Sequence, residues 1–246
     1  MINKLLPPIS AITVAIAIAV SACLLPSSAH ASGLDDVKKL SQDAFGKLAK
    51  DLAAVAAIRA LSPAVSLNLL GVDVSAEIGV ANVASGDVWK SAGGGSTAVI
   101  IPRVNIYKAF SGGSDIGLSL GAAGSSGLTT LGVVGRYQLL APATISPGIY
   151  VRFSGNRDIG SSTVDVRSLG LDLVVAKPIA FITPYIGAGG TRTDTKPLGS
   201  NLTAVSTSSG RLFAGFDTNL PFATLSAEAE KIGSVTTVST KLGFKF

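Results

Sequence analysis

The chain has 246 residues, a formal net charge of +5 and a mean hydropathy of +0.51, and only 14% of its residues are charged. The positive charge is too small and too scattered to predict a nucleic-acid partner. The single Cys and the single His lie within residues 1–31. Without that stretch, disulfides, thiol nucleophiles, His general bases and His or Cys metal sites are excluded.

The first residues have the layout of a secretory signal peptide. Lys4 precedes an apolar run over 9–25, and Ala29-His30-Ala31 forms a small-x-small cleavage site. We therefore expect residues 1–31 to be removed on export.

Two alternatives to simple cleavage remain open. The stretch 5–25 is just long enough to stay in a bilayer as an anchor. Cys23 ends the stretch Val20-Ser21-Ala22-Cys23, which resembles the lipobox of bacterial lipoproteins and would make Cys23 a lipidated first residue.

Residues 34–60, within an N-terminal unit at 32–63, predict an amphipathic helix that ends before Ser62-Pro63. Its apolar stripe is formed by Leu34, Val37, Leu40, Ala44, Phe45, Leu48, Leu52 and Val55. Asp35 and Asp36 at the start and Arg59 at the end suit the helix dipole.

The remaining chain is hydrophobic but has no apolar run near the ~18 residues of a spanning helix. From residue 70 the apolar residues alternate with polar ones, as they do in strands that face lipid on one side. Ten segments show this alternation: 70–82, 97–109, 114–123, 128–140, 146–156, 163–176, 179–191, 209–218, 222–232 and 235–246. Over 64–246 we therefore expect an all-β fold, a closed antiparallel transmembrane β-barrel of about ten strands, with eight or twelve as alternatives.

The last strand places Leu242, Phe244 and Phe246 on one face. This ending resembles the C-terminal β-signal of small bacterial outer-membrane β-barrel proteins, and the resemblance extends over 70–246. It implies a location in the outer membrane, contact with outer-membrane lipid and recognition of the last strand by the barrel-assembly machinery. The class has diverse functions, so the resemblance implies no catalytic residues.

The connections between segments differ in length. Those at 83–96, 157–162 and 192–208 include long stretches rich in Gly, Ser and Asp, and the others are tight turns. Barrels of this class have short periplasmic turns and longer outer loops, which predicts that the barrel begins and ends on the periplasmic side. We expect the N-terminal helix to pack there, on the end of the barrel or on the membrane surface. A plug inside the barrel is the alternative, but an apolar stripe suits a polar lumen poorly.

Aromatic residues on the lipid-facing register gather at the expected periplasmic end and predict an interfacial girdle. They are Phe110, Tyr137, Phe216, Phe244 and Phe246. The outer girdle is thin, and Trp89 in the first loop is its clearest candidate.

The opposite register predicts a lumen lined by charges of both signs. The expected charged residues are Asp73, Glu77, Arg103, Arg136, Arg152, Asp172, Arg211, Asp217, Glu228, Glu230, Lys241 and Lys245, with Asn105 and Gln138 beside them. A barrel of about ten strands is narrow, so we expect these charges to pair across the lumen and largely fill it. A narrow polar pore is the alternative.

The expected role is therefore structural or interactive within the cell envelope, with a narrow, porin-like passive channel for small solutes as the alternative. We expect no enzymatic activity, because the outer-membrane chemistries of this class rely on a His base. No cofactor or metal is expected. Gly187 to Gly190 lack the residues that follow a phosphate loop and instead predict close packing beneath a bulky neighbour.

Overall fold

The computed structural model describes residues 33–63, 71–124, 126–218, 220–221 and 223–246. The predicted signal peptide at 1–31 and Cys23 lie outside the described residues. No helix within them is long and apolar enough to cross a membrane.

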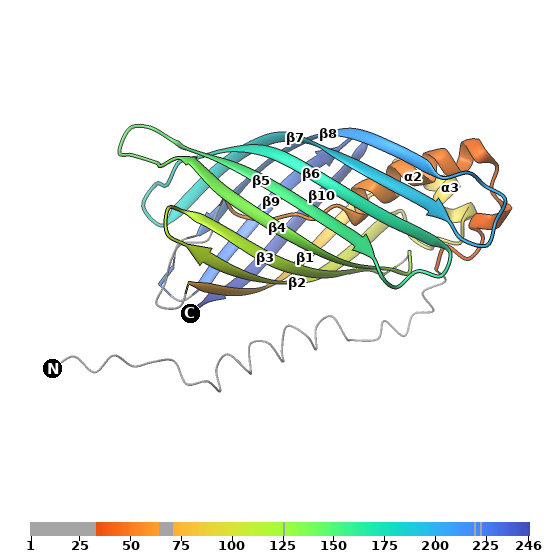
Figure 1. Ribbon diagram of the computed structural model, residues 1–246, viewed down its shortest axis with the longest axis horizontal. Helices are drawn as coiled ribbons and strands as arrows, with labels where there is room; N and C mark the ends of the chain where they lie inside the picture. The colour runs from red at the N-terminus through yellow and green to blue at the C-terminus, as the bar shows by residue number, and fades with distance from the viewer. Residues whose placement is uncertain (1–32, 64–70, 125, 219, 222) are drawn as a thin grey trace.

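Ten antiparallel strands form a closed barrel in which each strand pairs with its neighbours in the sequence and β1 also pairs with β10 (Figure 1). The predicted fold class and the strand number of ten are thus confirmed. The elements are η1 Val37–Lys39, α2 Gln42–Ala56, β1 Val72–Asn82, α3 Gly86–Ser91, β2 Ala98–Phe110, β3 Ser114–Ala123, β4 Leu128–Leu140, β5 Gly148–Asp158, β6 Val164–Ala176, β7 Ile182–Pro197, β8 Val205–Thr218, β9 Ala223–Ile232 and β10 Val235–Lys245.

The barrel carries its large apolar side chains on the outside and its charged side chains on the inside, the reverse of a soluble protein. Large apolar side chains such as Leu118 and Phe153 are about half exposed on the outer wall, whereas charged residues of the opposite register are buried inside. Closure leaves no free strand edge, which is the condition for a sheet to sit in lipid. The apolar outer wall and the closed sheet together make this a transmembrane barrel.

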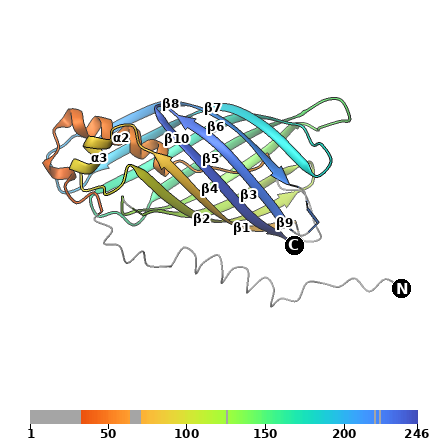
Figure 2. The same cartoon turned by 180° about the vertical axis from the view of Figure 1, so that it is seen from behind.

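The two ends of the barrel differ. One end, here called the cap end, carries the connection 83–97 together with α2 and α3. The other end, here called the C-terminal end, carries the start of β1 and the end of β10. Figures 1 and 2 show α2 and α3 at the end of the barrel opposite to the C-terminus.

The N-terminal helix is shorter than predicted at both ends. Ser41 separates η1 from α2 and its hydroxyl accepts a hydrogen bond from the Ala44 amide at 3.3 Å, which makes it the N-cap. At the other end, Ala57 leaves the helix with ψ of 136°. The carbonyls of Ala56 and Ala57 bind arginine side chains instead of continuing the helix.

The predicted loop 192–208 is mostly strand. β7 continues to Pro197 and β8 begins at Val205, so only 198–204 connects them. Threonines at 191, 193 and 195 point inward and alternate with outward charged residues. The period-two pattern is therefore present in the sequence. The segment was predicted as a loop because threonine is polar, although threonine has a high β propensity.

Candidate functional site: a lumen occupied by the chain's own N-terminal segment

The inside of the barrel carries all the charged residues that the alternation predicted. Each is less than one tenth exposed on the inner wall: Asp73, Glu77, Arg103, Arg136, Arg152, Asp172, Arg211, Asp217, Glu228, Glu230, Lys241 and Lys245. Asn105 is buried among them and Gln138 is half-buried.

Three further charged residues are buried inside the barrel and were not predicted. Asp158 ends β5 on the inward register and accepts hydrogen bonds from the amides of Thr129 and Ser161. Asp115 follows the same alternation in β3 as its inward neighbours, so its pattern was available in the sequence. The sequence predicts that Arg59 ends the N-terminal helix. It lies in the lumen because the chain beyond α2 enters the barrel, and no period-two pattern signals that.

Residues 57–62 cross the interior of the barrel between α2 and the C-terminal end. All of them are buried. Four arginines on four different strands donate hydrogen bonds to this segment, here called the threaded segment. Arg103 Nη2 binds the carbonyl of Ala57 at 2.9 Å, and Arg211 Nη2 binds that of Ile58 at 3.1 Å. Deeper in the barrel, Arg152 Nη1 binds the carbonyl of Ala60 at 2.9 Å.

The far end of the threaded segment is held by Ser62. Arg136 Nη1 donates to the Ser62 hydroxyl at 2.8 Å and to its carbonyl at 3.2 Å, and Lys241 Nζ lies 3.4 Å from the same hydroxyl. Charge-assisted bonds of this kind contribute about 1.5–3 kcal/mol each. Most of the acceptors are main-chain carbonyls, so the wall fixes the backbone path of the segment and leaves most of its side chains without such bonds.

Arg59 is the one charged residue of the threaded segment. Its Nε donates to Glu230 Oε1 at 2.8 Å, and its Nη2 donates to the Ala54 carbonyl at 2.7 Å and to Thr237 at 3.1 Å. Glu230 also pairs with Arg211. The segment therefore joins the wall's own ion pairs.

A continuous network of ion pairs extends from Glu230 across the wall. Arg211 Nη1 lies 3.2 Å from Asp172 Oδ2, and the same carboxylate accepts from Arg152 Nε at 2.9 Å. Arg152 Nη1 lies 3.6 Å from Glu228 Oε2, which accepts from the Tyr185 hydroxyl at 3.0 Å. A buried charge without a partner is very costly, so the network is what allows these groups to be buried.

Arg59 brings a positive charge to a wall with an excess of acidic residues. In the described residues the inner wall carries six basic side chains (Arg103, Arg136, Arg152, Arg211, Lys241 and Lys245) and eight acidic ones (Asp73, Glu77, Asp115, Asp158, Asp172, Asp217, Glu228 and Glu230). Arg59 supplies a seventh positive charge. The segment thus offsets part of the wall's negative excess as well as occupying the lumen.

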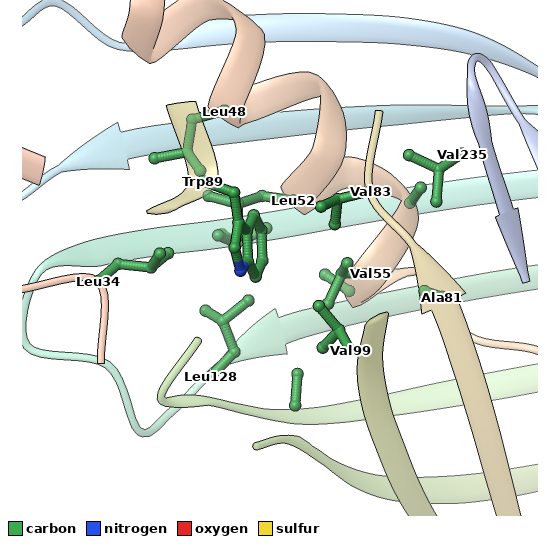
Figure 3. Packing of buried hydrophobic residues seen from close by; sticks show 14 of the residues in the cluster. Leu34, Leu48, Leu52, Val55, Ala81, Val83, Trp89, Val99, Leu128 and Val235 are labelled. Atoms are coloured by element: carbon green, nitrogen blue, oxygen red, sulfur yellow. The ribbon is translucent and has the colours of Figure 1, made fainter. Parts of the chain in front are cut away.

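The cap end explains how an apolar helix enters a charged barrel. Near this end a cluster of inward residues is apolar and includes Ala81, Val99, Val166, Ile232 and Val235, with inward threonines such as Thr193 and Thr195 at the same end. The stripe of α2, including Leu48, Leu52 and Val55, packs against them in one cluster (Figure 3). The expectation that an apolar stripe would keep the helix out of the lumen was wrong, because the lumen changes from charged to apolar along its length.

Trp89 belongs to this cluster and not to an outer girdle. It lies in α3 with none of its surface exposed and contacts the cluster beside Leu48 and Leu52 (Figure 3). Its indole also covers Gly94, where a Cβ would lie within 2.3 Å of the ring. The prediction that Trp89 marks the outer membrane interface was therefore wrong.

Asp51 fastens α2 to the first connection of the barrel. Its carboxylate accepts hydrogen bonds from the amides of Ala84 at 3.2 Å and Ser85 at 2.9 Å. Burial raises the pKa of the Asp51 carboxyl above its usual value of 3.8, and the two amide hydrogen bonds only partly oppose this rise.

The outer wall carries the residues assigned to the girdle and to the assembly signal. Phe110, Tyr137 and Phe216 are 41–56% exposed near the C-terminal end, and Leu242 and Phe244 are similarly exposed on β10. Phe246 exchanges two backbone hydrogen bonds with Val72, at 2.8 and 3.2 Å. The last residue thus extends the pairing that closes the barrel.

Glycines inside the sheet make room for neighbouring side chains, as the run 187–190 predicted. A Cβ on Gly187 would lie 2.1 Å from the Phe213 ring, and one on Gly189 would lie 2.3 Å from Asp172 Oδ1. Phe213 in turn lies under the Arg152 guanidinium, with 4.0 Å between the guanidinium carbon and the ring centroid. These small residues therefore serve the packing of the lumen.

Glu228 and Glu230 share a face and are both engaged by arginines. Within the described residues, no group of three or more His, Cys, Asp or Glu is arranged to hold a metal ion.

Comparison with known proteins gives a likeness of fold alone. No family model matches the chain, and no curated protein matches it. Among solved structures it is similar to Neisserial surface protein A, with 16% identity, a TM-score of 0.36, and 72% of this chain and 97% of that chain covered.

Two other similar structures have different roles. The KdgM porin has 10% identity and a TM-score of 0.38, with 71% of this chain and 99% of that chain covered. The outer membrane enzyme PagL has 12% identity and a TM-score of 0.36, with the same coverage of 71% and 99%. All are outer-membrane barrels, as the sequence-based class predicts, and their differing roles transfer nothing to this chain.

Proposed function

We propose that this protein is an outer-membrane barrel with a structural or interaction role in the envelope, closed to solutes by its own N-terminal segment. The observation that supports it is the set of four wall arginines, on β2, β4, β5 and β8, whose guanidinium groups bind 57–62 inside the lumen. A segment tied to four strands opposes diffusion along the axis. A barrel of about ten strands has little width left beside it.

The proposed orientation places the cap end outside the cell. The C-terminal end then faces the periplasm, where the barrel-assembly machinery would meet the strand that ends at Phe246. In this orientation the N-terminal helix lies outside the cell and not on the periplasmic side that the sequence predicts, because α2 lies at the opposite end of the barrel from the start of β1. Helices α2 and α3 and the β7–β8 connection would form the surface available to partners.

We also propose that the barrel is not an enzyme. Its buried carboxylates and arginines are engaged in ion pairs that hold the lumen, and residues 32–246 contain neither His nor Cys. A narrow passive channel is the second candidate, and the polar lining of both signs favours it. It would require the threaded segment to leave the lumen.

Planar-bilayer conductance separates the two candidates. The purified full chain is expected to be silent, whereas a variant that lacks 33–61 is expected to give stable openings. Its folding is checked by heat-modifiable mobility on gels. Stable single-channel openings of the full chain would overturn the proposal of a closed lumen.

A further inference from the structure

The outer wall carries a basic arc near the cap end. Strands β5 to β9 present five basic side chains outward there: Arg157, Arg167, Arg192, Lys196 and Lys231. Asp165 and Asp194 are the acidic residues on the same arc. In the described part of β1–β4 and β10, the outward residues of the half nearest the cap are uncharged.

The arginines of the arc are close neighbours. Arg157 and Arg167 lie directly opposite each other on β5 and β6, and like charges in this position repel. They share one carboxylate: Asp165 lies 2.9 Å from Arg167 Nη2 and 3.6 Å from Arg157 Nε. Arg192 pairs with Leu169, which places it diagonally from Arg167 on the same face. Asp194 accepts a hydrogen bond from Ser206. Positive charge therefore remains in excess.

Two grooves lie in the outer wall beside these charges. Leu169 and Leu171 border the first, Gly190 and Gly210 form its floor, and Arg192 lies at its edge. Leu169 and Leu171 are 67% and 61% exposed, so they project above the small residues beside them.

The second groove adjoins the first along the same strands. Its lining includes Leu173, Leu212 and the small residues Ala188 and Ala214, with Lys231 among them. Leu212 is 64% exposed and lies directly opposite Lys231 across β8 and β9. Each groove thus combines apolar walls with one basic side chain.

We propose that this arc binds a lipid with several acyl chains and phosphate groups from the leaflet that surrounds the cap end, which is the outer leaflet in the orientation proposed above. The acyl chains lie in the two grooves, and Arg167, Arg192 and Lys231 bind the phosphates. Guanidinium groups bind phosphate oxygens in a bidentate manner, and each basic residue near an anionic lipid surface contributes roughly a fivefold gain in affinity. Two adjacent grooves and several cations favour a diphosphorylated, multiply acylated lipid over a single-phosphate one.

The test uses the full chain in nanodiscs and native mass spectrometry, with diphosphorylated lipid A and its dephosphorylated form as probes. The wild type is expected to retain the phosphorylated form at least tenfold better. Arg167→Gln/Arg192→Gln/Lys231→Gln should remove this preference. Lys38→Gln/Lys39→Gln/Lys90→Gln is the matched control, since it removes the same charge from exposed residues of η1 and α3 that line neither groove.

A second variant tests the groove without changing charge. A Cβ at Gly210 meets no atom within 4 Å, so Gly210→Leu is accommodated and fills the floor of the first groove. It should lower retention several-fold and leave the heat-modifiable fold intact. Equal retention of the two lipids by the wild type, or unchanged retention by the triple arc variant, would overturn the proposal in favour of ordinary lipid solvation.

Discussion

Arg59 offers the sharpest test of the threaded segment, because it is the segment's one charge and lies between Glu230 and Thr237. Arg59→Met keeps an unbranched side chain about as long as the aliphatic part of arginine and removes the guanidinium charge. Breaking a buried ion pair costs about 3–5 kcal/mol. Glu230 retains Arg211, so we expect the lower end, about 3 kcal/mol, which is roughly a 100-fold shift toward segments that have left the lumen.

This cost acts on the docking of the segment and not on the sheet, whose backbone hydrogen bonds are unchanged. Arg59→Met should therefore fold as a heat-modifiable barrel, show brief conducting events in planar bilayers, and lose hydrogen-exchange protection over 56–62. Lys47→Met, on the exposed face of α2, is the control and should remain silent.

A double variant identifies the partner. Because Arg59 and Glu230 interact directly, Arg59→Met/Glu230→Gln should cost less than the sum of the two single changes. Unchanged conductance and unchanged protection in Arg59→Met would refute the idea that this ion pair holds the segment in place.

Three further predictions concern the cap, the orientation and the closing strand. Ionisation of the buried Asp51 is disfavoured in the folded state, so the docking of α2 should weaken as pH rises from about the usual Asp pKa of 3.8 through the raised pKa of this carboxyl. The emission of Trp89, the only tryptophan, should then shift to longer wavelength. Asp51→Asn should remove that pH dependence. Lys47→Cys should react with an impermeant maleimide on intact cells and Thr144→Cys only after the outer membrane is permeabilised, with the natural chain as background; the reverse pattern would invert the proposed orientation. Phe246→Asp should lower the amount of folded, heat-modifiable barrel several-fold, because it places a charge on the outward register of the strand that closes the barrel, where the backbone of Phe246 pairs with Val72. Normal assembly of this variant would contradict the role of Phe246.

Alternation along the strands was sufficient to predict most of the fold. Segments 114–123 and 128–140 coincide with β3 and β4, and the twelve inward charges follow from one register choice for each strand. A one-residue slip of β9 would place Glu228 and Glu230 in lipid, so the sequence strongly specifies the register of this strand. The same logic could have included Asp115, and it could have extended β7 through the threonines of 191–195.

The path of residues 57–62 could not be predicted in this way. The segment is short, has no period, and carries one charge that suited a helix end equally well. Its position depends on carbonyl oxygens meeting arginines from strands β2, β4, β5 and β8, which lie far away in the sequence. Main-chain acceptors are the same in every residue, so no side-chain pattern records such contacts.

The sequence by itself therefore determined the closed barrel, its inner charges and its lipid-facing wall, because a period of two records which side of a strand each residue faces. Only the tertiary structure decided that the N-terminal helix enters the cap end, that Trp89 packs against it, and that the chain crosses its own lumen. These features depend on where the apolar part of the interior meets the charged part. That boundary exists only once ten strands, separated in the chain, have closed around a common axis.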